Sequence, residues 1–186
     1  PMYKTGFDRN LWLWEQYNPE ASYLMVADVA RGDGADFSVF HIVKLETMEI
    51  IGEYRGKPNL EEFAAILDTI LEKLQTREYP NIYFSVKGTH EYIDQVQAQS
   101  ITNSIAGFTT SSKTRPLIVA KMEEFIRNKL ITIYSSRLVD EFKTFIWNNN
   151  RAQAMRSYHD DLVMALAIGC WVRDTALTTN QRELEY

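Results

Sequence analysis

The stretch YLMVAD, residues 23–28, decides how this chain is organised. It is a continuous apolar run of strand length that ends in the carboxylate of Asp28, which is typical of a buried central strand. A glycine-containing turn at residues 31–36 follows, and further strands are predicted at residues 38–44 and 49–54, which suggests an antiparallel meander. An Asp at the end of a central strand, before a turn that phosphate can approach, suits metal-dependent phosphoryl transfer. A hairpin whose Asp only caps the turn gives the same pattern.

A second acidic point, His159-Asp160-Asp161, lies directly before the apolar stretch of residues 162–171. This stretch is apolar on nearly every side, so we expect a buried helix whose N-terminus points into a cleft. Two adjacent carboxylates there repel one another, and a divalent cation supplies the compensation. Asp also favours helix N-caps and first turns, which is the simpler explanation of the pair. We favour metal binding by Asp28 and Asp161, with Asp160 as a further ligand that is partly a cap. His159 either orients a ligand or is simply a flanking polar residue, and we favour the latter.

The composition bounds the class of protein. A chain of 186 residues with 45% apolar and 24% charged residues fits one globular domain. We expect a linker at residues 1–20, the domain at residues 21–177 and a frayed tail at residues 178–186. The net charge of −5 argues against a uniformly basic nucleic-acid-binding surface. It does not exclude a nuclease, because metal-binding carboxylates add negative charge that Mg²⁺ neutralises.

The cysteine count and the hydropathy set further limits. The single cysteine, Cys170, excludes an intramolecular disulfide, and we expect it in the core of a protein from a reducing compartment. No uncharged apolar run reaches about 18 residues, so we expect no membrane span. The N-terminal residues lack the continuous apolar segment of a signal peptide.

The middle of the chain predicts helices joined to short strands. Helical spacing begins after residues 58–59 and continues to residue 79, and a short strand is predicted at residues 81–85. A long polar connection then leads to a helix at residues 117–127. A strand at residues 130–134, a helix that begins at Ser135 or Ser136, and a turn within residues 147–151 complete the pattern.

One basic segment stands out in the polar connection. The sequence SSKTRP, residues 111–116, carries Lys113 and Arg115 among hydroxyl side chains, a composition that suits contacts with phosphate. The same segment fits a helix N-terminus capped by Thr114, and both can hold, because helix N-termini bind phosphate. We predict DNA contacts at Lys113, Arg115 and Lys87.

Taken as a set, these segments resemble the C-terminal nuclease domain of the large terminase subunit of tailed phages. The likeness rests on residues 28–36, on Lys87-Gly-Thr-His, on residues 109–115 and on residues 158–165, and it covers about residues 23–177. It implies an α/β protein with a ribonuclease H-like mixed β-sheet and helices on both faces. It also implies a Mg²⁺- or Mn²⁺-dependent endonuclease that cuts concatemeric viral DNA when packaging starts and ends.

The resemblance assigns roles and partners. In this family three acidic residues hold the metal; Asp28 matches the first and Asp161 the last, with Asp160 as an auxiliary neighbour. Two ions about 4 Å apart would then be bridged by Asp28, one activating a water and the other stabilising the leaving 3′ oxygen. The implied partners are double-stranded DNA, the terminase ATPase domain, the small terminase subunit and the capsid portal, in the host cell cytoplasm. No phosphate-binding loop of the ATPase type occurs here, so we expect the nuclease part alone.

The sequence departs from the family at the second acid. The family places a Glu at the end of a fourth strand, after the first long helix, and no apolar strand that ends in Glu occurs between Tyr54 and Tyr83. Loss of that strand would leave a buried neighbour without hydrogen-bond partners. We therefore hypothesise that the printed sequence joins two helices across omitted residues, around Ala65 to Ile70. Otherwise Glu62 or Glu91 is left to substitute.

Two other functions fit the same residues. One is a different ribonuclease H-like nuclease, such as a resolvase or transposase core, which would differ in the DNA structure that it cuts. The other is a non-catalytic module that docks onto the portal and has an incomplete acid set. A third carboxylate beside Asp28 and Asp161 in the folded chain would best separate the nuclease from the docking module.

Overall fold

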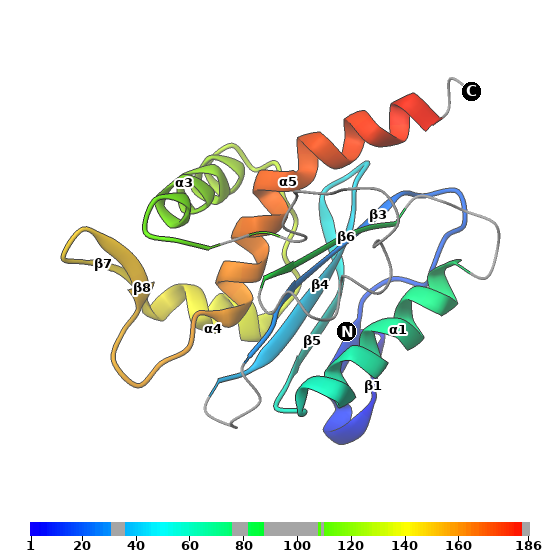
Figure 1. The fold of residues 1–186 in the computed structure, drawn as a ribbon, viewed down its shortest axis with the longest axis horizontal. Helices are drawn as coiled ribbons and strands as arrows, with labels where there is room; N and C mark the ends of the chain where they lie inside the picture. The colour runs from blue at the N-terminus through cyan, green and yellow to red at the C-terminus, as the bar shows by residue number, and fades with distance from the viewer. Residues whose placement is uncertain (31–35, 76–81, 88–107, 109, 184–186) are drawn as a thin grey trace, which may run out of the picture.

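Six strands form one mixed sheet in the computed structural model, which describes residues 1–30, 36–75, 82–87, 108 and 110–183 (Figure 1). The strand order is β1-β2-β5-β4-β3-β6. Strands β3, β4 and β5 form the predicted antiparallel meander, and β6 runs parallel to β3 on its other side. The bounds are β1 (Tyr3–Thr5), β2 (Leu11–Leu13), β3 (Tyr23–Asp28), β4 (Ser38–Lys44), β5 (Glu49–Gly56) and β6 (Ile82–Lys87).

The N-terminal residues belong to this sheet. Strands β1 and β2, separated by the short 3-10 helix η1 (Phe7–Arg9), form a hairpin, and β2 pairs with the edge of β5. The register places Leu11 opposite Tyr54 and Leu13 opposite Gly52. We expected a linker at residues 1–20; the structure instead adds two strands there.

Helices cover both faces of the sheet, as the resemblance implied (Figure 1). Every residue of β3 is buried, and its side chains alternate between two cores. Tyr23, Met25 and Ala27 pack with α1 (Leu60–Gln75). Leu24 and Val26 pack with α3 (Thr114–Arg127), α4 (Ser136–Thr144) and α5 (Asp161–Glu183). By this alternation, Asp28 lies on the same face of the sheet as Leu24 and Val26, which α5 covers.

The helix α5 crosses the sheet closely. Residues 162–168 and Cys170 are all buried, which confirms the expected core helix and the core position of the cysteine. A Cβ atom added at Gly169 would lie 3.1 Å from Cγ1 of Val26, so the glycine allows the helix to approach β3. Within the described residues, no helix is long and apolar enough to cross a membrane.

The fourth strand that the family requires is present as β6. It pairs with β3 over the whole of that strand, from Tyr23 opposite Ile82 to Asp28 opposite Lys87. Helix α1 is unbroken and starts with a reciprocal cap. The side chain of Asn59 accepts a hydrogen bond from the backbone amide of Glu62, and the side chain of Glu62 accepts one from the backbone amide of Asn59. The reason for the hypothesis of omitted residues is therefore removed, because β3 has its neighbour. The strand ends in Lys87 rather than in Glu, and Glu91 lies outside the described residues.

The segment between α3 and α4 differs from expectation. The strand predicted at residues 130–134 forms only an isolated bridge, in which Thr132 exchanges backbone hydrogen bonds with Met48 and Ile50. The expected turn near residue 149 is present as a hairpin between β7 (Phe145–Asn148) and β8 (Arg151–Ala154). Asn149 and Asn150 both have positive φ, 48° and 60°, as a two-residue hairpin of this type needs.

Candidate metal centre

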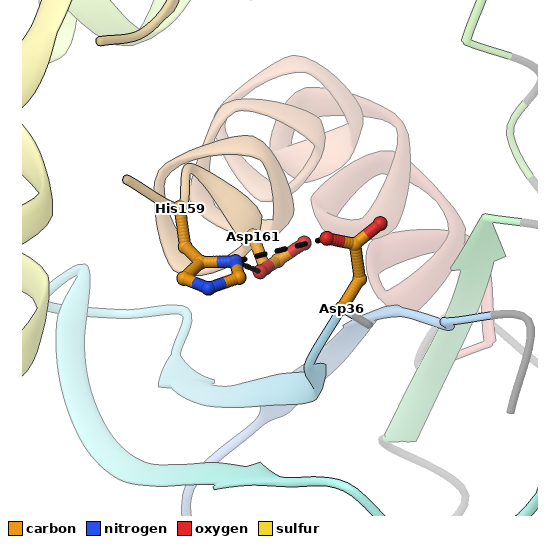
Figure 2. A group of neighbouring side chains, drawn as sticks. All are labelled: Asp36, His159 and Asp161. Atoms are coloured by element: carbon orange, nitrogen blue, oxygen red, sulfur yellow. Dashed lines mark ion pairs between the residues drawn. The ribbon is translucent and has the colours of Figure 1, made fainter. Parts of the chain in front are cut away.

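The site is built around Asp161, the first residue of α5. Figure 2 shows its carboxylate beside the side chains of Asp36, from the approach to β4, and His159. The Nδ1 atom of His159 lies 3.5 Å from Oδ2 of Asp161 and 3.7 Å from Oδ1 of Asp36. One possible ligand atom from each residue lies within 4.8 Å of the others, a spacing that suits a shared cation.

The charges around Asp161 oppose its ionisation. Burial, followed by the negative charges of Asp28, Asp36 and Asp160, raises the pKa of Asp161 to about 7. A hydrogen bond from the backbone of Phe37 acts in the opposite direction. Atom Oδ2 of Asp161 is buried and has no hydrogen-bond partner among the described residues. A carboxylate oxygen that accepts no hydrogen bond and lies among like charges fits a divalent cation, which would supply both the ligand contact and the compensating charge.

Asp28 lies at the end of β3, buried at 5% exposure, on the face that α5 covers. After burial, its charge is the next largest cause of the raised pKa of Asp161, so the two acids that the sequence paired act on one another in the fold. Asp28 is not one of the three residues whose ligand atoms lie within 4.8 Å of one another. The two carboxylates are separated by more than 130 positions in the sequence. Their role as metal ligands stays a prediction.

Asp160 points elsewhere. Its carboxylate accepts hydrogen bonds from the guanidinium of Arg115 and, at 3.2 Å, from the backbone amide of Ala154. Its backbone carbonyl accepts the first helical bond of α5, from Met164 at 2.8 Å, so Asp160 occupies the N-cap position without capping through its side chain. These contacts give its side chain structural partners, while its charge still acts on Asp161. Its role as a further metal ligand stays a prediction.

The three basic residues predicted to contact DNA have different surroundings. Arg115 is 8% exposed and its Nε atom donates to the carbonyl of Ala152 at 2.9 Å, so burial argues against the predicted phosphate contact. Lys113 is exposed at the N-terminus of α3 and remains available. The backbone of Lys87 lies opposite Asp28 in the sheet register.

The N-terminus of α3 borders a pocket of about 300 Å³ beside the turn of the β7–β8 hairpin. The expected cap at Thr114 is replaced by a reciprocal pair: Ser111 Oγ accepts from the Thr114 amide at 3.1 Å, and Thr114 Oγ1 accepts from the Ser111 amide at 2.8 Å. The pocket is lined by Thr110, Ser111, Ser112, Arg115, Pro116, Asn150, Arg151 and Ala152.

Two residues of the cluster, Asp36 and His159, were not predicted as metal ligands. Asp36 was part of the turn after β3, where an acidic residue suggests only turn geometry. His159 was interpreted as a flanking residue, yet burial and then the charge of Arg55 lower its pKa, which favours the neutral imidazole that ligates metals. The signal for His159 in the sequence was its position next to Asp160 and Asp161. The signal for Asp36 was its position just before β4, the strand that pairs with β3.

The fold can be compared with solved structures. No model of a known protein family matches the chain. The large terminase nuclease of thermophilic phage G20c is 20% identical, with a TM-score of 0.66, and the match covers 85% of this chain and 86% of that one. The same nuclease with bound magnesium is 19% identical, with a TM-score of 0.68 and coverage of 87% and 86%.

A second phage provides the same result. The large terminase nuclease domain of Thermus phage P74-26 is 21% identical, with a TM-score of 0.70, over 89% of this chain and 85% of that one. At this level of identity the likeness establishes architecture, and it agrees with the mixed sheet and two helical layers seen here. The chain therefore has the ribonuclease H-like fold of the phage large terminase nuclease domains.

Proposed function

We propose that this chain is a divalent-metal-dependent DNA endonuclease that cuts concatemeric viral DNA during packaging. The observation that supports this most is the buried Oδ2 atom of Asp161, which has no hydrogen-bond partner among the described residues and lies in the cluster with Asp36 and His159. It lies where α5 meets the end of β3, in a fold shared with terminase nucleases. One of those nucleases, from phage G20c, has been solved with bound magnesium, cobalt and zinc.

The residues divide the work as follows. Asp28, Asp36 and Asp161 would hold the metal through carboxylate oxygens, with His159 as a nitrogen ligand. We propose Mg²⁺ or Mn²⁺, two ions per site, which when bound make a water more acidic and neutralise charge on the phosphodiester. The burial of Asp28 and the partial burial of Asp161 limit access of bulk water to these carboxylates. Lys113 would contact a DNA phosphate from outside the acidic cluster, which positions the duplex without reading its sequence.

The rival functions make different demands on these residues. The docking module was considered because a third carboxylate was missing from the sequence pattern, and β6 indeed ends in Lys87. Asp36 supplies a third carboxylate beside Asp161, which favours catalysis over docking alone. A resolvase or transposase core would share the metal site but require branched or end-specific DNA. The partners included in the proposal are double-stranded DNA, the ATPase domain, the small terminase subunit and the portal, in the host cytoplasm.

Nicking of supercoiled plasmid tests the proposal. The wild-type chain should nick and linearise plasmid in Mn²⁺ or Mg²⁺ and do neither in EDTA. Asp161→Asn and Asp28→Asn should each lower the rate by at least about a hundredfold, because each removes a ligand rather than an outer contact. Asp140→Asn is the matched control, since Asp140 is 69% exposed and pairs only with Lys143 among the described residues. Retained nicking by Asp28→Asn would contradict the site, and a preference for branched DNA would favour the resolvase class.

A further inference from the structure

The first turn of α5 is capped by a residue from another helix. Because Asp160 turns its side chain toward Arg115, the amides of Leu162 and Val163 lack the usual cap from within the helix. Glu141 of α4 takes this place: its Oε2 atom accepts from the Leu162 amide at 2.9 Å and from the Val163 amide at 3.2 Å. These are the two residues directly after Asp161, so Glu141 holds the backbone from which the central carboxylate projects.

Glu141 is itself held in place. It is 6% exposed, and a buried carboxylate is costly unless other groups compensate its charge. The Nε atom of Arg55, from β5, lies 3.5 Å from Oε1 of Glu141. The guanidinium of Arg55 also lies 3.9 Å from the centre of the Phe37 ring, and that ring packs edge-on against His159 at 4.8 Å. Arg55 thus contacts both Glu141, which caps the turn after Asp161, and the Phe37 ring, which packs against His159.

A second buried contact reaches the same turn. The Nε2 atom of His41, a fully buried residue of β4, lies 2.9 Å from the carbonyl oxygen of Leu162. A carbonyl can only accept, so this nitrogen is the donor. Leu162 is therefore fixed at its amide by α4 and at its carbonyl by the sheet. Two independent elements constrain the residue that follows Asp161.

We propose that Glu141, supported by Arg55, is a positioning residue for the metal centre: it fixes the first turn of α5 and thereby the direction of the Asp161 carboxylate. The inference deepens the proposed function and rests on it. Groups that orient metal ligands typically change metal affinity by 10- to 100-fold when removed. A residue that only stabilised the fold would lower the melting temperature and leave the affinity of the folded protein unchanged.

Mn²⁺ binding, measured by isothermal titration calorimetry below the melting temperature of each variant, tests this role. Glu141→Ala should weaken Mn²⁺ binding about tenfold or more. Glu141→Gln keeps an oxygen that can accept from both amides, so its affinity should stay within about threefold of wild type. The control Asp140→Asn, from the exposed face of the same helix, should match wild type. Unchanged affinity in folded Glu141→Ala would overturn the proposal.

Two further measurements keep the test decisive. If Glu141→Ala does not fold, Glu141→Asp replaces it, because the shorter side chain cannot reach both amides and should still weaken Mn²⁺ binding; wild-type affinity in this variant refutes the role. Amide exchange at Leu162 and Val163, measured without metal, should be faster in the Ala or Asp variant than in Gln. Absence of Mn²⁺ binding by the wild-type chain would contradict the proposed function itself. Unchanged amide exchange would contradict the cap alone.

Discussion

The carboxylate of Asp160 is paired with the buried guanidinium of Arg115, 45 positions earlier in the chain. The same guanidinium donates to Ala152, and the same carboxylate accepts from Ala154. This small network ties α3, β8 and the start of α5 together. Arg115, whose sequence context suggested a phosphate contact, thus holds the side chain of Asp160 in place.

Loss of this pair should cost stability. Arg115→Met should lower the free energy of unfolding by about 2–4 kcal/mol, because it leaves Asp160 and the Ala152 carbonyl without their buried donor. Urea denaturation with and without the substitution measures the difference. Lys113→Met is the comparison, because Lys113 lies two positions earlier and is exposed; it should change the free energy of unfolding by less than about 0.5 kcal/mol. Equal effects of the two substitutions would show that the Arg115 network contributes nothing.

For DNA binding, the order of the two residues should be reversed: Lys113 should matter more than Arg115. Lys113→Ala should weaken binding to any duplex sequence and reduce the slope of log affinity against log salt by about one, since a phosphate contact is lost. Arg115→Met, assayed where it is folded, should leave that slope unchanged, because the buried guanidinium faces protein. Filter binding or fluorescence anisotropy at several salt concentrations measures both slopes. A smaller slope for Arg115→Met would place that side chain at the DNA after all.

How much of this molecule the sequence predicts depends on how local each feature is. The apolar runs around Val26 and Leu166 identified the central strand and the core helix, because burial on all sides leaves a continuous pattern. The role of β6 was missed, since pairing with β3 is a long-range property that no local pattern encodes. The positions of Asp36 and Arg115 could not be foreseen for a similar reason: their neighbours His159, Asp161 and Asp160 lie far away in the sequence.

Asp161 should destabilise the metal-free protein at neutral and higher pH. Its pKa is raised from 3.8 to about 7 in the folded state, so the folded protein binds the proton more tightly than the unfolded chain. The resulting stability is present below pH 4 and is lost as the pH rises through about 7. Asp161→Asn cannot ionise. Its stability relative to wild type should therefore increase by about 1–3 kcal/mol between pH 4 and pH 8.

Urea denaturation in EDTA at these two pH values measures the change. Asp140→Asn serves as the control for the loss of an acidic side chain from an exposed position. If the stability difference between Asp161→Asn and wild type does not vary with pH, the pKa of Asp161 is not raised in the folded, metal-free protein. Addition of Mn²⁺ should raise the melting temperature of wild type and not that of the Asn variant.

The hairpin turn should respond to backbone conformation rather than to charge. Asn150 has a φ of 60°, which glycine adopts without strain and a β-branched residue does not. Asn150→Gly should raise the free energy of unfolding by up to about 0.5–1 kcal/mol, and Asn150→Val should lower it by about 1–2 kcal/mol. Thermal denaturation followed by circular dichroism measures both. Similar stability of the two variants would argue against the two-residue turn.

Asp36 and His159 should rank below Asp161 as metal ligands but remain measurable. The Asp36 side chain is 69% exposed and that of Asp161 only 16%, so water can replace Asp36 more easily. Asp36→Asn and His159→Gln should each weaken Mn²⁺ binding about tenfold, and Asp161→Asn should abolish it at millimolar metal. Calorimetric titration of the three variants gives this order. Asp8→Asn, an exposed acid on the far N-terminal hairpin, is the control for a general loss of negative charge. Wild-type affinity in Asp36→Asn would remove the third carboxylate from the site, and the docking module would then regain its support.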